Sequence, residues 1–129
     1  MTLDSSALLA ILFGEPGYLD LVDRVLAADV VRIGTPTLTE TAVVLTARRR
    51  GKGADELARL LEELDVAVVP FTQAHHEAAA RAYERYGRGR HKANLNFGDC
   101  LCYAVASLAG DSLLFVGDDF RRTDIESAL

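Results

Sequence analysis

The stretch Val66-Ala67-Val68-Val69-Pro70 is a continuous apolar run that ends at a proline. Such a run, with no alternating polar residues, is typical of a strand buried within a parallel sheet. Three further short apolar segments have the same character, at residues 2–3, 30–34 and 112–116. Segments with helical periodicity separate them, and strands that alternate with helices form parallel sheets. The sequence therefore predicts a three-layer α/β/α sandwich with a central, mostly parallel sheet.

The helices are predicted from apolar spacing and from residues that end helices. Four leucines between residues 57 and 64 have the i, i+3, i+4, i+7 spacing of an amphipathic helix. Gly51 follows another helical segment and is a good C-terminal cap. The predicted helices cover residues 5–13, 18–28, 37–50, 54–64, 73–86 and 98–108. We expect a basic loop at 87–96 and a last short strand near Ile125.

The composition indicates one globular domain over residues 1–129, with 50% hydrophobic and 26% charged residues. The net charge of −5 argues against nucleic-acid binding by the whole surface. The apolar run Ala7–Phe13 is too short to cross a bilayer and follows Asp4 rather than basic residues, so we expect no membrane span and no signal peptide. Two cysteines cannot form a disulfide framework, so we expect a reduced, cytoplasmic protein. Cys100 and Cys102 are expected in the core, not in a disulfide or a zinc site.

Acidic side chains follow the ends of the predicted strands. They are Asp4 after the first strand, Glu40 one helical turn after the second, Asp99 at the start of an apolar helix, and Asp118 and Asp119 after residues 112–116. The carboxyl ends of parallel strands meet at one edge of a sheet, so we expect these carboxylates to lie together. Clustered carboxylates need a cation or a shared proton. Oxygen ligands select hard ions such as Mg²⁺ or Mn²⁺, which can activate water for attack on a phosphodiester.

Helix capping is the alternative explanation for each of these acids. Thr37-Leu38-Thr39-Glu40 and Asn96-Phe97-Gly98-Asp99 both have the spacing of a capping box. Asp4 stands where the N-cap of the following helix is expected. A metal site is favoured by the set as a whole, because all four positions fall at one sheet end. Ser5 and Ser6 could offer a hydroxyl to a metal-bound water or to phosphate, or could simply start the helix.

Two basic clusters interrupt an otherwise acidic sequence. The first contains Arg48, Arg49, Arg50 and Lys52, and the second contains Arg85, Arg88, Arg90 and Lys92. Such side chains could bind RNA phosphates on both sides of a cleaved bond. They could equally be solvated, or pair with acids of a partner protein. Tyr83, Tyr86 and Phe97 could stack on bases, although core packing is the commoner role of such residues.

Four segments resemble motifs of the PIN-domain family, in the family's order. They are Leu3–Ile11, Thr35–Glu40, Leu95–Ala104 and Leu113–Phe120. The short chain and the Asn-Phe-Gly-Asp motif are most similar to VapC toxins of bacterial and archaeal VapBC toxin–antitoxin pairs. The resemblance implies an endoribonuclease that depends on Mg²⁺ or Mn²⁺, forms a homodimer and is inhibited by a VapB-type antitoxin.

The same resemblance implies roles for the acids. Asp4 and Asp99 would be the principal metal ligands, and Glu40 would complete the cluster directly or through water. Asp118 is preferred over Asp119 as the fourth acid because it is nearer the strand end. Two other functions remain open: a PIN-like module that binds RNA or protein without cleavage, and a receiver-type phosphoacceptor domain. The receiver is disfavoured because no Asp follows residues 66–69 and no Lys follows residues 112–116.

Overall fold

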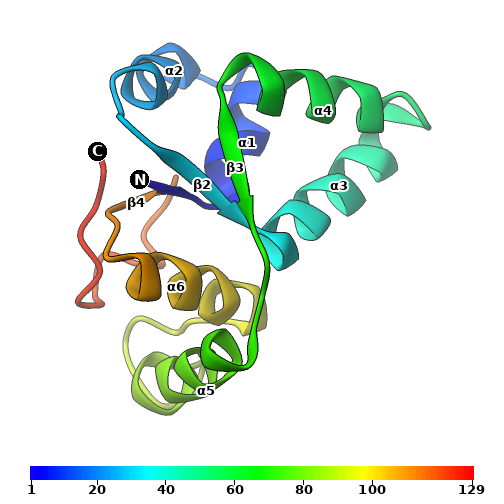
Figure 1. Ribbon diagram of the computed structural model, residues 1–129. Coiled ribbons are helices and arrows are strands. Elements are labelled where there is room, and N and C mark those ends of the chain that lie inside the picture. Colours follow the sequence, from blue (N-terminus) through cyan, green and yellow to red (C-terminus); the bar gives the residue numbers. More distant parts are fainter.

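The computed structural model describes residues 1–129 and contains a four-stranded sheet with helices on both faces (Figure 1). The strands are β1 (Thr2–Leu3), β2 (Val31–Gly34), β3 (Val66–Val69) and β4 (Leu113–Leu114). The helices are α1 (Ser5–Leu12), α2 (Tyr18–Leu26), α3 (Thr35–Arg49), α4 (Gly53–Glu63), α5 (Gln73–Tyr86) and α6 (Phe97–Ala109). The strand order is β3-β2-β1-β4 and every pairing is parallel. The predicted three-layer α/β/α architecture is confirmed.

Each face of the sheet has its own apolar core. In Figure 1, α1 to α4 lie above the sheet and α5 and α6 lie below it. Leu113 packs with residues of α5 and α6, whereas its neighbour Leu114 packs with Leu3, Leu8 and Ile33 on the other side. This division arises because successive side chains of a strand point to opposite faces. Full burial of each such leucine stabilises the fold by about 1.5–3 kcal/mol.

The strand β3 lies at one edge of the sheet. It pairs only with β2, with Val66 opposite Val31. Ala67 and Val68 are exposed, Val68 to 44%. The predicted position of the strand is confirmed, but the prediction that it is buried is wrong. An edge strand has no neighbour on its outer side, so a continuous apolar run does not by itself guarantee burial.

Two other elements differ from the sequence-based prediction. The helix α3 begins at Thr35 rather than at 37, because Pro36 is accommodated in the first helical turn, where no amide partner is needed. No strand forms near Ile125; the chain there makes a single parallel bridge between Ser127 and Leu113. None of the helices combines the length and apolar character needed to cross a membrane.

Candidate active site

Four acidic side chains meet near the carboxyl ends of β1, β2 and β4. Asp4 directly follows β1, Glu40 lies in the second turn of α3, and Asp99 is the third residue of α6. Asp119 lies in the segment after β4. The negative charges of Asp119, Asp4 and Glu40 all act on Asp99. The structure therefore brings together acids from four separate parts of the chain.

Asp99 is the buried member of this group, with 9% of its surface exposed. Burial raises the pKa of Asp99 to about 6, and the charges of Asp119, Asp4 and Glu40 add to this effect. A hydrogen bond from the Asn96 amide opposes it only in part. Burial and the neighbouring carboxylates therefore make the charged form of Asp99 less favourable than that of a free aspartate, and a cation beside it would favour that form.

Asp4 and Asp99 also cap helices. Oδ2 of Asp4 accepts hydrogen bonds from the Ser6 amide at 3.1 Å and from the Ser6 hydroxyl at 2.5 Å. The Asp99 amide donates to Oδ1 of Asn96 at 2.8 Å, and Oδ2 of Asp99 accepts from the Asn96 amide at 3.0 Å. The predicted capping box at 96–99 is confirmed. Asp4 and Asp99 therefore each make capping hydrogen bonds at the start of a helix and also belong to the acidic group.

Capping does not explain Glu40. Because α3 begins at Thr35, Glu40 lies beyond the first turn, and the N-cap Gly34 makes no side-chain bond. The capping box considered for Thr37 and Glu40 is therefore absent. Oε1 of Glu40 instead accepts a hydrogen bond of 2.5 Å from the hydroxyl of Ser5. Glu40 is held towards the acidic group by a residue of another helix.

The hydroxyls of Ser5 and Ser6 are both directed at protein groups. Ser5 donates to Glu40 and Ser6 donates to Asp4. Oγ of Ser6 also accepts from the Val116 amide at 3.0 Å, which ties the end of β4 to the start of α1. The sequence could not reveal these contacts, because the partners lie 35 and 110 residues away.

The two aspartates after β4 have different environments. Asp118 is 90% exposed, and its Oδ1 lies 3.0 Å from Nε of Arg121. Asp119 is also exposed, but its charge acts on Asp99 more strongly than that of Asp4 or Glu40. This effect on Asp99 makes Asp119 a candidate for the fourth acid beside Asp118, the residue preferred from the sequence. Gly117, which precedes both aspartates, has a φ of 101°.

The donor set fits a hard divalent cation in its chemistry, because the charged side chains of the group are carboxylates, whose oxygens are the ligands that such ions prefer. No three of these side chains converge on one point in the way that a bound ion requires. Asp4, Glu40 and Asp99 are turned instead towards hydroxyl and amide donors. A metal ion would have to draw these carboxylates towards itself.

The first basic cluster lies far from the acids. Arg48 and Arg49 are at the C-terminal end of α3, about 13 Å along the helix from Glu40 at 1.5 Å per residue. Their guanidinium groups lie 4.8 and 5.1 Å from the ring centre of Phe13. Arg49 also pairs with Glu56 at 3.4 Å. Arg50 and Lys52 follow on the exposed connection to α4. The structure does not bring this cluster to the acidic group.

The second basic cluster precedes the acidic group directly in the chain. Arg88, Arg90 and Lys92 are exposed on the loop that leads into Asn96. Arg85 pairs with Asp124 at 3.3 Å. Two further basic residues, Arg121 and Arg122, follow the acids after β4; Nη1 of Arg122 donates to the Lys92 carbonyl of this loop at 3.2 Å, whereas Arg121 pairs with Asp118. Arg121 and Arg122 directly follow Asp118-Asp119-Phe120 in the sequence, and this position close to two candidate acids could have identified them.

The aromatic and sulfur-bearing side chains divide between surface and core. Tyr86 is buried, whereas Tyr83 is 43% and Phe97 is 78% exposed. Phe97 and Tyr83 line an apolar hollow of about 360 Å³ between α5 and α6. Cys100 and Cys102 are buried, as predicted. Burial raises the pKa of the Cys100 thiol to about 11, so it remains protonated and is a poor metal ligand.

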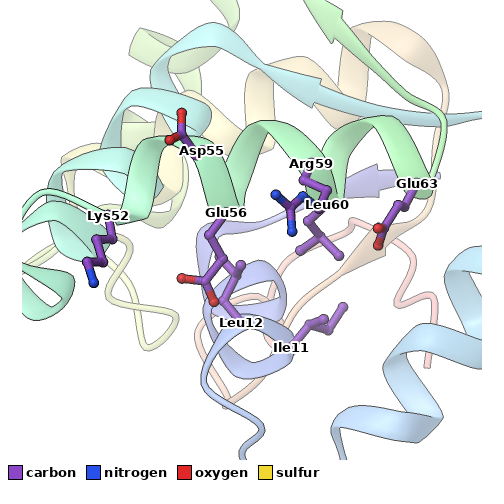
Figure 2. Close-up of a pocket in the computed structure, with 8 residues that line it drawn as sticks. All are labelled: Ile11, Leu12, Lys52, Asp55, Glu56, Arg59, Leu60 and Glu63. Carbon is purple, nitrogen blue, oxygen red and sulfur yellow. The ribbon is translucent and has the colours of Figure 1, made fainter.

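A second hollow, of about 390 Å³, lies between α1 and α4 (Figure 2). Its apolar floor contains Ile11, Leu12 and Leu60. Charged side chains surround this floor: Lys52, Asp55, Glu56, Arg59 and Glu63. The groove lies at the C-terminal end of α1, whereas the acidic group lies at its N-terminal end.

The fold and the site together define an α/β protein with an acidic centre at the carboxyl edge of a parallel sheet. A family model described as the PIN domain matches residues 1–126. Ribonuclease VapC36 of Mycobacterium tuberculosis is 44% identical over 127 residues, which cover 98% of this chain and 91% of the relative. Ribonuclease VapC of Mycolicibacterium smegmatis is 44% identical over 126 residues, which cover 97% of each chain. The chain belongs to the PIN-domain family, and its similarity to the VapC ribonucleases confirms the resemblance found in the sequence.

Two solved structures share the fold at low sequence identity. VapC20 of Mycobacterium tuberculosis, described as a toxin that cleaves the sarcin–ricin loop, aligns with a TM-score of 0.77 and 20% identity, covering 96% of this chain and 95% of the other. A toxin–antitoxin complex from Klebsiella pneumoniae aligns with a TM-score of 0.73 and 15% identity, covering 99% and 97%. These alignments support the fold of the whole chain.

Proposed function

We propose that this protein is a metal-dependent endoribonuclease, the toxin of a type II toxin–antitoxin pair, which acts in the cytoplasm. The observation that carries the proposal is the group of carboxylates around buried Asp99, on which the negative charges of Asp119, Asp4 and Glu40 all act. Membership of a family whose curated relatives are named ribonucleases supports it. The proposed ion is Mg²⁺, with Mn²⁺ as an alternative, because the available ligands are carboxylate oxygens.

In the proposed mechanism, Asp4, Asp99, Glu40 and Asp119 would hold the ion. When bound, a divalent ion would supply positive charge for cleavage of a phosphodiester and would favour ionisation of a water. Ser6 keeps the Asp4 carboxylate in place through its hydroxyl and its amide. The capping box of Asn96 fixes the start of α6 and with it the backbone of Asp99. The chain thus orients the acids from the starts of two helices.

RNA phosphates need positive charge near this acidic edge. The exposed Arg88, Arg90 and Lys92 are the best placed of the predicted RNA-binding residues, because their loop continues into the start of α6. Arg122, which bonds to the same loop, extends this basic surface. Arg48 and Arg49 are less well placed, since they lie at the other end of α3 and stack on Phe13.

The test is incubation of a mixed cellular RNA pool with the purified protein in Mg²⁺, in Mn²⁺ and in excess chelator, followed by mapping of new 5′ ends. We expect cleavage at discrete positions with either metal and none with the chelator. Specific binding of RNA without new 5′ ends would favour the alternative of a catalytically silent PIN-like module. Phosphorylation of one aspartate by a small phosphodonor would instead favour the receiver-type alternative.

The cognate antitoxin of the VapB type is proposed to bind the groove between α1 and α4 (Figure 2). An apolar floor with charged walls suits an amphipathic helix. A small antitoxin-like protein, if encoded beside this gene, would be the candidate partner. Arg59→Glu should weaken its binding and its inhibition of cleavage, whereas Arg81→Glu, an exposed arginine on α5, should change neither. Equal inhibition of both variants would exclude this groove.

A homodimer is proposed through the aromatic face that α5 and α6 present. Phe97 and Tyr83 are exposed large side chains beside Phe71 and Leu101, around one apolar hollow. A patch of this kind favours association. Phe97→Arg should convert a dimer to a monomer in sedimentation, whereas Leu19→Arg, at a leucine of α2 that is 62% exposed, should not. A wild-type monomer at micromolar concentration would refute the dimer.

A further inference from the structure

We propose that Ser5 and Gly98 are positioning residues that fix the carboxylate of Glu40 within the acidic group. The activity part of this inference rests on the proposed nuclease function, whereas its structural part does not. Neither residue would itself contact a metal or RNA. Both act through Glu40, one on each oxygen of its carboxylate.

Ser5 holds the first oxygen. It is the first residue of α1, and its hydroxyl donates a hydrogen bond of 2.5 Å to Oε1 of Glu40. The hydroxyl of a first-turn serine often serves its own helix, but here that task falls to Asp4, the N-cap. Ser5 is therefore free to bind a carboxylate on α3. A hydrogen bond to a charged acceptor is stronger than one between neutral groups, so this contact restricts the Glu40 side chain.

Gly98 controls the space beside the second oxygen. A β-carbon added at Gly98 would lie 2.6 Å from Oε2 of Glu40 and 3.5 Å from Oδ1 of Asn96. Gly98 is the second residue of α6 and does not have a positive φ, so its backbone does not demand glycine. Glycine also destabilises a helix relative to alanine. Space for the Glu40 carboxylate is the structural reason for a glycine at this position.

The two contacts link Glu40 to the other acids of the group. Ser5 directly follows Asp4, and Gly98 directly precedes Asp99. Fixing the two oxygens of Glu40 against these neighbours also fixes where its carboxylate stands relative to Asp4 and Asp99. A displaced Glu40 would leave the group with the same charges but with poorer geometry for an ion. The expected defect is therefore in metal affinity more than in turnover at saturating metal.

The activity arm compares Ser5→Ala, Ser5→Thr and Gly98→Ala with wild type in Mg²⁺ titrations of RNA cleavage. We expect Ser5→Ala to raise the half-saturating Mg²⁺ concentration about tenfold, the loss typical of one hydrogen bond to a charged group. Gly98→Ala should raise it in the same direction, because the added methyl group would displace the Glu40 carboxylate. Ser5→Thr keeps the hydroxyl and should remain near wild type. Ser107→Ala, on the exposed far part of α6, is the control for Ser5→Ala and should cause no shift.

The structural arm needs no nuclease activity. Thermal unfolding is measured for wild type, Gly98→Ala, Glu40→Ala and the double variant, all without metal. We expect Gly98→Ala to lower the melting temperature in wild type but to raise it by a few degrees in the Glu40→Ala background, where the added methyl group meets no carboxylate. An equal change in both backgrounds would overturn the role of Gly98. Unshifted Mg²⁺ titrations for Ser5→Ala would overturn that of Ser5, whereas a wild-type protein that cleaves no RNA would overturn only the proposed function.

Discussion

The Asp99 amide donates a hydrogen bond to Oδ1 of Asn96 at 2.8 Å, while Oδ2 of Asp99 accepts one from the Asn96 amide at 3.0 Å. Asp99 thus stabilises the start of α6, and it also carries a negative charge that burial and the neighbouring carboxylates disfavour. An asparagine at position 99 can still accept the amide hydrogen bond. Substitution therefore separates the capping role of Asp99 from its charge.

We expect Asp99→Asn to be more stable than wild type at pH 8, by on the order of 1–3 kcal/mol without metal. The folded-state pKa of about 6 lies above the ordinary value of 3.8, so ionisation of Asp99 costs the wild type stability as the pH rises through this range. Below pH 3.8 both states of the wild type are protonated and the difference should vanish. Urea unfolding at pH 8, 6 and 4 measures this; a variant less stable at every pH would contradict the account.

Asp118 and Asp119 provide a matched pair of substitutions. Asp119→Asn should lower cleavage at least about tenfold, equivalent to 1.4 kcal/mol in the barrier, because its charge acts on Asp99. Asp118→Asn should change cleavage by no more than about twofold, since Asp118 is exposed and pairs with Arg121. Rates at saturating Mg²⁺ decide between them. The reverse ranking would restore Asp118 as the fourth acid.

The basic loop should contribute to RNA affinity. Arg88→Ala with Arg90→Ala, made in an inactive Asp99→Asn protein, should weaken RNA binding and reduce the slope of log K against log salt by about one to two, because each phosphate contact releases a counterion. Arg48→Ala with Lys52→Ala removes the same charge at the far end of α3 and is the control. A filter-binding series in NaCl measures both. Equal affinities and slopes for the two double variants would remove the loop from the RNA surface.

Asp111 should have the opposite pH dependence to Asp99. Burial alone would raise the pKa of Asp111, but hydrogen bonds from Thr2 and Arg32 outweigh it and the pKa is lowered. The Arg32 contact is 2.9 Å long. Asp111→Ala should therefore reduce stability by about 1–3 kcal/mol at pH 7. The stabilisation from Asp111 is lost as the pH falls through its lowered pKa, so the variant should approach wild type near pH 2. A constant difference from pH 7 to pH 2 would contradict this.

The fold was largely predictable because its signals are local. Short apolar runs, helical spacing and Gly51 located the main elements, and parallel pairing follows from their alternation. The exposure of β3 was not predictable, because an apolar sequence such as Val66–Val69 is compatible with a central strand as well as with an edge strand. The strand expected near Ile125 does not form. The chain there makes an isolated bridge between Ser127 and Leu113 rather than a continuous pairing of two strands.

The site was predictable as a set of acids but not as a geometry. The positions of Asp4 and Glu40 after strand ends, and of Asp99 at the start of a helix, identified these three acids as neighbours. Asp118 pairs with Arg121 whereas the charge of Asp119 acts on Asp99, and the order of the two residues does not predict this difference. Ser5 and Glu40 are 35 residues apart in the sequence, and the spacing of apolar residues within a helix does not predict a contact between two helices.

The most direct measurement is cleavage of one RNA preparation by wild type, Asp4→Asn and Asp99→Asn at saturating Mg²⁺, with thermal unfolding run on the same samples. The account predicts discrete cleavage by wild type, loss of at least about a hundredfold for each variant, and folded proteins in all three cases. Chelator should reduce the wild-type rate to that of the variants. Wild-type rates from folded Asp4→Asn or Asp99→Asn, or cleavage that persists in chelator, would contradict a metal-dependent ribonuclease site at this edge of the sheet.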